Sequence, residues 1–170
     1  EQLRDEADYH KEAKFLGAFG DLLREDERFV VPEVLPELTH RNVLAMTYVS
    51  GSPIDAVIDQ PQEERDRVMS TLIELMLMEL FELRMVQTDP NFANYRYRAA
   101  TGEIVLLDFG ATRRFKATFA NNYRKMAAAA IAGDTQKMAA AAERLGYVMG
   151  DANTEYRELV LELLMLAMEP

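Results

Sequence analysis

The chain has 170 residues, of which 49% are apolar and 28% are charged. This composition is typical of a globular protein with one well-buried core, and it excludes an intrinsically disordered chain. The net charge of -10 argues against nucleic-acid binding, which needs a basic surface, and against broad electrostatic docking on anionic lipid. The chain has no cysteine, so disulfides and thiolate metal sites are excluded.

The chain begins inside a charged helical pattern without an initiator methionine, so we expect it to be a piece of a longer protein. A transmembrane helix needs about 20 largely apolar residues. The most apolar segment, residues 68–86, is interrupted by Glu74, Glu79 and Arg84. We therefore expect this segment to be a buried core helix, and we expect no transmembrane span in this chain.

The first half of the chain is predicted to combine helices with two strands. The expected elements are a helix over residues 3–19, strands over 29–32 and 42–49, and a short helix over 54–58. A long helix then begins near Pro61, which suits a first helical turn. Because Pro90 disfavours helical geometry at Asp89, this helix is expected to end in the loop of residues 88–90.

The second half is predicted to contain a strand hairpin followed by helices. The expected elements are strands over 95–98 and 104–107, a turn over 99–102, and helices over 119–132, 135–145 and 154–168. Asp134 is the expected cap of the second of these helices, and Thr154 or Asn153 caps the third. Small strands set among several helices predict an α+β fold.

The segment from Asp89 to Gly110 carries the strongest functional pattern. Asp89 is followed five residues later by Asn94, and the hairpin then leads to Asp108, Phe109 and Gly110. Kinase-like folds use this order to hold nucleotide-bound metal ions and to orient a nucleophile. Each residue alone also suits an ordinary turn, but that interpretation does not explain their joint order and spacing.

The chemistry of these side chains assigns each a candidate role. Asp89 is the candidate catalytic base, beside the attacking hydroxyl or water. Asn94 and Asp108 are candidate ligands of Mg²⁺, or Mn²⁺, that bridges the phosphates of ATP. Carboxylate and amide oxygens are hard ligands that suit these ions. We therefore expect ATP and a divalent metal ion as the cofactors.

Residues 46–51 have the composition of a kinase hinge, which is a strand feeding a short loop between two lobes. Backbone groups at Thr47 and Val49 are candidates for hydrogen bonds to an adenine, with Met46 packed behind it. The alternative is a strand that leaves the core through a turn at Gly51. The position of this segment, one long helix before the Asp89 loop, favours the hinge.

Acidic residues gather on the predicted first helix at Glu6, Asp8 and Glu12. Asp8 and Glu12 are four residues apart, and a like-charged pair at that helical spacing costs roughly 0.2–0.5 kcal/mol. One interpretation is a solvated face relieved by Lys11 and Lys14. The other is that these acids pair with cations from elsewhere in the protein.

Four motifs together resemble the UbiB family of atypical kinases, also called AarF-domain or ABC-one kinases. The motifs are residues 6–13, 48–51, 87–94 and 106–113, and they stand in the family order. The resemblance implies a protein-kinase-like fold. Residues 50–170 would be the helical large lobe with family-specific C-terminal helices, and residues 1–49 a remnant of the small lobe with its hinge strand.

The resemblance also implies residue roles. Glu6 and Asp8 match the Glu-x-Asp motif of the family, which pairs with a lysine of a Lys-x-Gly-Gln extension. Glu12 matches the acid that pairs with the small-lobe lysine. Asp89 matches the catalytic-loop aspartate of the family, and Asn94 and Asp108 match its Mg²⁺ ligands. The Lys-x-Gly-Gln motif, the nucleotide loop and the small-lobe lysine are missing from this chain.

The activity implied by the resemblance is that of an ATPase or small-molecule kinase that supports ubiquinone biosynthesis. The implied partners are a nucleotide and quinone-pathway enzymes or lipid quinone intermediates. The implied location is the bacterial cytoplasm at the inner-membrane face, which is favoured, or the mitochondrial matrix side. The alternatives are a catalytically silent, pseudokinase-like scaffold and a small-molecule phosphotransferase of the aminoglycoside or choline kinase type.

Overall fold

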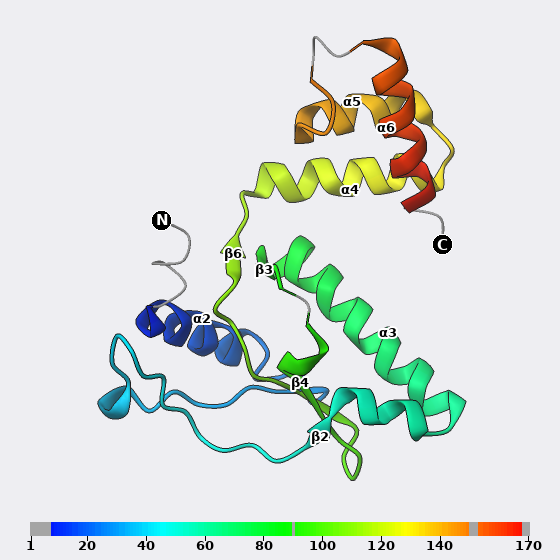
Figure 1. The fold of residues 1–170 in the computed structure, drawn as a ribbon. Coiled ribbons are helices and arrows are strands. Elements are labelled where there is room, and N and C mark those ends of the chain that lie inside the picture. Colours follow the sequence, from blue (N-terminus) through cyan, green and yellow to red (C-terminus); the bar gives the residue numbers. More distant parts are fainter. Residues whose placement is uncertain (1–7, 90, 150–152, 168–170) are drawn as a thin grey trace. The chain divides into compact units, whose positions relative to one another are not determined.

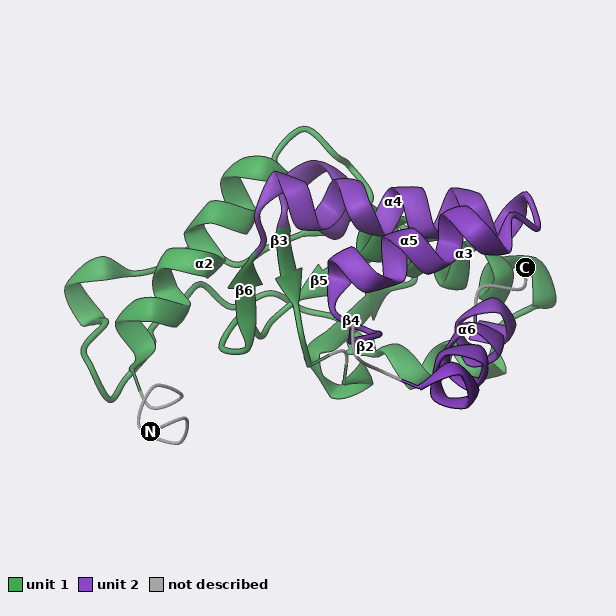
Figure 2. Ribbon diagram, turned by 90° about the horizontal axis from the view of Figure 1, so that it is seen from above, with its two compact units in different colours: residues 1–79, 85–114 green, residues 80–84, 115–170 purple. Residues whose placement is uncertain are grey.

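The computed structural model describes residues 8–89, 91–149 and 153–167, and these form two compact units. Unit 1 comprises residues 1–79 and 85–114, and unit 2 comprises residues 80–84 and 115–170 (Figure 2). The predicted lobe boundary between residues 49 and 50 is a different division of the chain, and it stays a prediction. Helices and small sheets together make an α+β fold (Figure 1).

Unit 1 combines helices with a four-stranded and a two-stranded sheet. Its helices are α2 (Tyr9–Leu22), α3 (Gln62–Met78) and the 3-10 turns η1 (Pro36–Leu38), η2 (Ile54–Asp59) and η4 (Phe92–Asn94). Its strands are β1 (Phe29–Val30), β2 (Ser52–Pro53), β3 (Met85–Gln87), β4 (Tyr95–Arg98), β5 (Glu103–Leu106) and β6 (Thr112–Arg114). The larger sheet has the order β1-β5-β4-β2, with β1 parallel to β5, and β3 pairs with β6.

Helix α2 begins later than predicted because Asp8 caps it. Asp8 has extended backbone angles, and its Oδ1 accepts a hydrogen bond from the His10 backbone N–H at 3.1 Å. Asp8 and Glu12 are therefore not a pair within one helix, and the predicted helical repulsion between them is wrong. The remainder of the predicted helix start, residues 3–7, lies outside the described residues.

The end of α2 also differs from the prediction, because the helix continues through Gly17 and Gly20 to Leu22. A glycine in a helix interior costs about 1 kcal/mol relative to alanine. Leu16 and Phe19 on the same helix are fully buried, and burying one large apolar side chain contributes about 1.5–3 kcal/mol. Tertiary packing therefore outweighs the local preference.

The predicted hairpin is present as β4 and β5. The strands pair in antiparallel register, with Tyr95 opposite Leu106 and Arg98 opposite Glu103. The turn between them uses Gly102, which has a φ of +78° and donates its N–H to the Arg98 carbonyl at 2.7 Å. This hairpin joins Asn94, directly before β4, to the segment of Asp108, shortly after β5.

The predicted strand over residues 42–49 is wrong, since only short bridges form there. The Leu35 N–H donates to the Ala45 carbonyl and the Thr47 N–H donates to the Glu33 carbonyl, both at 2.8 Å. Single bridges join Val34 to Met46 and His40 to Val43. The composition of the segment suits a strand, but the length of a strand is set by how far its partner runs alongside it.

The predicted end of the long helix is also wrong. Helix α3 ends at Met78, a π-helical turn η3 (Glu79–Leu83) follows, and β3 occupies residues 85–87. Strand β6, which the sequence did not predict, pairs with β3 and places Gln87 opposite Thr112. This pairing joins residues 25 positions apart in the chain and has no local signal.

Two phenylalanines link the first helix to the predicted metal segment. The rings of Phe19 on α2 and Phe109 lie with centroids 4.8 Å apart, and both side chains are 0% exposed. Aromatic pairs at this separation add about 0.5–1.5 kcal/mol to the effect of burial. The contact fixes α2 beside the segment that carries Asp108.

Unit 2 is a helical cluster of α4 (Ala117–Ile131), α5 (Thr135–Leu145) and α6 (Thr154–Ala167). The Asp134 side chain caps α5, as predicted, and Gly146 ends it in the left-handed conformation. Of the two alternatives for α6, Asn153 is the cap, since its Oδ1 accepts from the Tyr156 N–H at 2.8 Å. Buried Met and Ala side chains of α4 and α5 form its core, in which alanines permit close packing.

No helix in the described ranges combines the length with the apolar character that crossing a membrane requires.

Truncation of the buried ring should test the aromatic contact. We expect Phe19→Ala to lower the free energy of unfolding by about 3–5 kcal/mol, because it leaves a cavity against Phe109. Denaturant unfolding of the chain measures this change. The matched control is Phe92→Ala, a ring that is 55% exposed, for which we expect a change of about 0.5 kcal/mol or less. Equal losses in the two variants would contradict the assignment.

Candidate functional site

The loop that carries Asp89 is tied to the segment that carries Asp108. Strand β3 ends at Gln87, and the next residue, Thr88, donates both its N–H and its hydroxyl to the Ala111 carbonyl, at 3.3 and 2.6 Å. Asp89 lies one residue beyond this link, and Ala111 lies one residue beyond Gly110. The two acids are therefore carried by adjoining segments of unit 1.

Asn94 is held by the same loop. Its backbone carbonyl accepts from the Leu107 N–H at 3.0 Å, so it lies beside the residue that precedes Asp108. Its side-chain Nδ2 is 3.4 Å from the Asp89 carbonyl, and the Asn91 N–H donates to that carbonyl at 2.8 Å. The structure thus brings the backbone positions of Asp89, Asn94 and Asp108 together, and the Asn94 carboxamide oxygen is the atom suited to a metal.

Gly110 lies between two carboxylates. The Asp108 Oδ1 accepts from the Gly110 N–H at 2.9 Å. A Cβ placed on Gly110 would lie 3.3 Å from the Glu12 Oε2 and 3.4 Å from the Asp108 Oδ1. These distances place the Glu12 and Asp108 carboxylates beside one backbone position, and a glycine there leaves room for both.

The proximity of the two carboxylates has an electrostatic consequence. Burial raises the pKa of the Glu12 carboxyl, and the negative charge of Asp108 raises it further, while the Phe109 backbone amide partly offsets these effects. Two neighbouring carboxylates repel, and a positive charge beside them removes that repulsion. The arrangement therefore favours a cation at this position, whether a lysine or a metal ion.

The residues present fit Mg²⁺ or Mn²⁺ by donor type, since a carboxylate and a carboxamide offer hard oxygen atoms. Across residues 8–89, 91–149 and 153–167, no group of three or more His, Cys, Asp and Glu side chains has the geometry to hold a metal ion. The candidate pair of Asn94 and Asp108 is not such a group, because it has two protein ligands and one of them is an asparagine. Sites with few protein ligands leave the remaining positions to phosphate oxygens and water.

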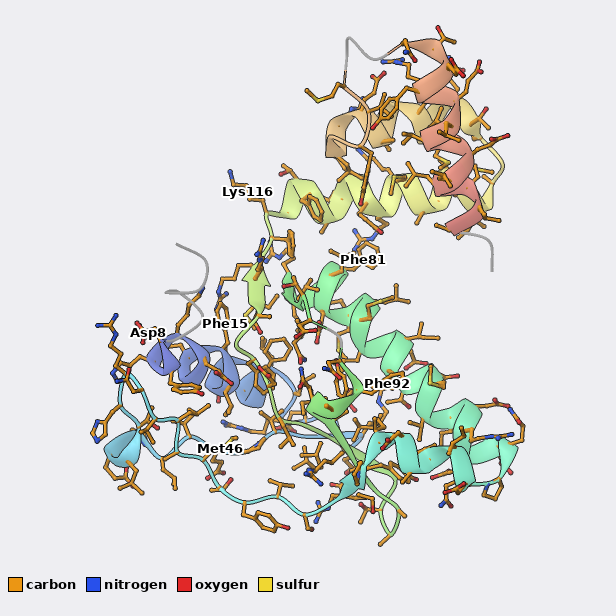
Figure 3. The ribbon with its side chains drawn as sticks, in the orientation of Figure 1. Asp8, Phe15, Met46, Phe81, Phe92 and Lys116 are labelled. Carbon is orange, nitrogen blue, oxygen red and sulfur yellow. The ribbon has the colours of Figure 1, made fainter. Side chains whose placement is uncertain are left out.

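The predicted hinge residues lie on an extended segment of unit 1. Met46 lies on this segment (Figure 3). Its side chain is half-buried. The Thr47 N–H is already bonded to Glu33, and the Thr47 hydroxyl accepts from the Glu33 N–H at 2.9 Å. An adenine contact at Thr47 would therefore use its carbonyl oxygen. Contacts of a nucleotide with these residues and with Val49 stay a prediction.

Of the two residues of the predicted regulatory motif, Asp8 lies within the described residues and Glu6 does not. Asp8 lies at the start of α2, where it acts as the helix cap described above (Figure 3). Glu6 lies outside the described residues. A local capping role explains the position of Asp8, and the regulatory role of Glu6 and Asp8 stays a prediction.

A buried acid, which sequence analysis did not assign to the site, lies next to the Asp89 loop. Glu79 is 4% exposed. Its Oε2 accepts from the Gln87 backbone N–H at 2.9 Å and its Oε1 from the Gln87 Nε2 at 2.8 Å. Burial raises the pKa of Glu79 to about 7, and burial with the charges of Glu79 and Asp89 raises the pKa of Tyr95 to about 12.

The sequence held only a shared signal for this residue. Glu74, Glu79 and Arg84 all interrupt the most apolar segment, and of these three Glu79 alone is buried, where an acid needs hydrogen-bond partners.

Comparison with known proteins identifies the family of this chain. A family model described as the ABC1 atypical kinase-like domain matches residues 1–142. The chain belongs to this family. The match covers every residue of the candidate site, and it favours the UbiB resemblance over the aminoglycoside or choline kinase alternative.

Relatives within the ABC1 family include mitochondrial atypical kinases. The atypical kinase COQ8B of Danio rerio is 38% identical over 165 residues, which are 97% of this chain and 26% of that protein. The atypical kinase COQ8 of Saccharomyces cerevisiae is 34% identical over 169 residues, which are 99% of this chain and 34% of that protein. The chain thus spans about a quarter to a third of the length of these two relatives.

A solved structure shows the same fold. The complex of Rv3197 with erythromycin from Mycobacterium tuberculosis has a TM-score of 0.81 and 24% identity, and the match covers 98% of this chain and 42% of that one. The predicted kinase-like fold is therefore confirmed.

The buried acid should give the ABC1 chain a distinctive pH dependence. The pKa of Glu79 in the folded chain, about 7, exceeds its ordinary value of 4.5. The folded state therefore keeps a proton that the unfolded state loses, and the free energy of unfolding should fall as the pH rises from about 4.5 to about 7. We expect Glu79→Gln to make this fall smaller in urea unfolding at several pH values.

The control for this experiment is Glu82→Gln, which changes an exposed acid of the same turn and should keep the original pH dependence. The raised pKa of Glu12 also makes the free energy of unfolding fall with rising pH. The effect of Glu79 is therefore read from the difference between variants. Identical profiles for Glu79→Gln and the unaltered chain would contradict the prediction.

Proposed function

We propose that this chain is the catalytic portion of a Mg²⁺-dependent atypical kinase or ATPase. The observation that carries the proposal is the pair of carboxylates, Glu12 and Asp108, that borders Gly110 next to the loop of Asp89 and Asn94. Family membership supports the same activity class. The arrangement offers hard oxygen ligands, a solvent-exposed acid and a glycine that admits close approach.

Each residue then has a defined task. Asp89, exposed at the loop, orients the attacking hydroxyl or water and accepts its proton. Asn94 and Asp108 would hold Mg²⁺, which would supply the positive charge that offsets the phosphate charge of the nucleotide. Glu12 pairs with a lysine that positions the nucleotide, which relieves its repulsion from Asp108. The carbonyl of Thr47 and the backbone of Val49 bind the adenine, with Met46 behind it.

We further propose that the intact protein supports ubiquinone biosynthesis rather than phosphorylating proteins, with quinone-pathway enzymes or lipid quinone intermediates as partners. The UbiB resemblance carries this step, and the names of the COQ8 relatives support it. Those names include the word mitochondrial. They favour the mitochondrial matrix side over the bacterial location that the sequence alone favoured.

The first test is Asp108→Asn in the intact protein. We expect its affinity for MgATP and its turnover to fall by about 100-fold or more, because changing even an outer-shell partner of a metal ligand costs about 10- to 100-fold. In a thermal-shift measurement, MgATP at about 100 times its dissociation constant should stabilise the unaltered protein by about 2.7 kcal/mol. This stabilisation should be lost in the variant.

The unliganded variant provides the internal control. Asparagine keeps the Oδ1 that accepts from Gly110 but removes the charge facing Glu12. Without nucleotide, Asp108→Asn should therefore be at least as stable as the unaltered protein. Unchanged turnover and unchanged MgATP affinity would overturn the proposed function. Lost turnover with retained MgATP stabilisation would remove Asp108 from the metal site.

The second test is Gly110→Ala, which should lower turnover by about tenfold or more without unfolding the protein. The added methyl group would lie 3.3 Å from the Glu12 Oε2, which is tighter than usual, and 3.4 Å from the Asp108 Oδ1, at the edge of ordinary contact. The Glu12 carboxylate must therefore shift relative to Asp108. The matched control is Gly17→Ala in α2, where a Cβ meets no atom within 4 Å. That variant should keep its turnover and gain up to about 1 kcal/mol of stability. Equal turnover in the two variants would contradict the site geometry.

A further inference from the structure

The buried acid Glu79 makes two hydrogen bonds to Gln87, the residue that precedes the Asp89 loop. Glu79 lies where α3 ends and the π-helical turn begins, and its two carboxylate oxygens accept from the backbone N–H and from the side-chain Nε2 of Gln87. Both residues are buried, at 4% and 8% exposure. Above its pKa of about 7 the Glu79 carboxyl is ionised, and hydrogen bonds to a charged acceptor are roughly twice as strong as those between neutral groups.

The neighbouring strand β6 supplies no hydrogen-bond acceptor to the Gln87 side chain. Thr112 lies opposite Gln87 in the β3–β6 register and is 2% exposed. Its hydroxyl has no hydrogen-bond partner among the residues that the structure describes. The Gln87 side chain therefore bonds to Glu79 and not across the sheet.

We propose that Glu79 is a positioning residue: by accepting both hydrogen bonds of Gln87, it holds the Asp89 loop in the geometry that catalysis requires. Gln87 is two residues before Asp89, and the intervening Thr88 is the residue tied to Ala111. A displacement of Gln87 would therefore pass to Asp89 and to the Thr88 link through rigid backbone. This inference rests on the proposed function of the loop.

Because Glu79 and Gln87 are buried, losing a hydrogen bond between them carries a high energetic cost. A buried donor that loses its acceptor costs about 1–3 kcal/mol, so the Gln87 N–H and Nε2 both need Glu79. In Glu79→Gln, the new carboxamide oxygen accepts from the Gln87 backbone N–H, and the new NH₂ group faces the Gln87 Nε2. The Gln87 carboxamide must then turn over to accept with its own oxygen. The variant therefore keeps the side-chain volume, but it reorients Gln87 and removes the charge from both hydrogen bonds.

The exchange of the two residues restores the pairing. In the double variant Glu79→Gln/Gln87→Glu, the carboxamide oxygen at position 79 accepts from the backbone N–H of residue 87. Its NH₂ group then donates to the new carboxylate at position 87. The double variant thus restores a charge-assisted hydrogen bond between the two side chains, with donor and acceptor exchanged, so it is the conservative rescue of the single variant.

The experiment compares four forms of the intact protein with the unaltered one: Glu79→Gln, Gln87→Glu, the double variant, and Glu82→Gln as the exposed control. We expect Glu79→Gln to lower kcat for ATP hydrolysis by up to about 100-fold, the effect of misplacing a catalytic group by about 1 Å. The KM for MgATP should change much less, because Glu79 contacts neither of the candidate metal ligands. The double variant should recover most of the lost kcat, and Gln87→Glu alone should not.

A second readout needs no activity. Hydrogen–deuterium exchange over residues 85–89 should be faster in Glu79→Gln, restored in the double variant and unaltered in Glu82→Gln. If Glu79→Gln does not fold, the double variant decides: activity with unaltered exchange supports the proposal, and a folded but inactive protein overturns it.

Different results would overturn the positioning role and the proposed function. Unchanged kcat in folded Glu79→Gln, while Asp89→Asn abolishes turnover, overturns the positioning role and leaves the proposed function standing. Unchanged turnover in both Asp89→Asn and Asp108→Asn overturns the proposed function and the positioning role with it.

Discussion

The contact between Phe19 and Phe109 is the constraint on which the candidate site depends. It joins α2 to the residue that follows Asp108, and it is fully shielded from water. Because Glu12 lies two turns before Phe19 on the same helix, a rigid α2 carries its carboxylate to Gly110. An apolar contact thus sets the separation of two charged groups that would otherwise repel each other.

Two acids of unit 1 are placed at a cost in electrostatic energy, and each lies next to a predicted catalytic segment. Glu12 faces Asp108, and Glu79 lies beneath the loop of Asp89. Burial raises the pKa of both carboxyls. Acids with perturbed pKa values are enriched at functional sites, where catalysis requires their placement. We infer that the fold tolerates Glu12 for nucleotide chemistry and Glu79 for loop geometry.

Much of the fold followed from local patterns. The β4–β5 hairpin and helices α4 to α6 lie close to their expected ranges, because alternation, helical spacing and caps such as Asp134 act over a few residues. Most of the failures share a cause. The strands β3 and β6 and the Val34–Met46 bridge depend on partners 12 or more positions away in the chain. No short window contains that information.

The sequence by itself determined the family and the order of Asp89, Asn94 and Asp108, since side-chain chemistry and spacing are written along the chain. Only the tertiary structure decided that Glu12 borders Asp108 at Gly110, and that Glu79 holds Gln87. Both pairings need a helix packed against a segment from elsewhere in the chain. The desolvation that raises the pKa of Glu79 to about 7 exists only once that packing has formed.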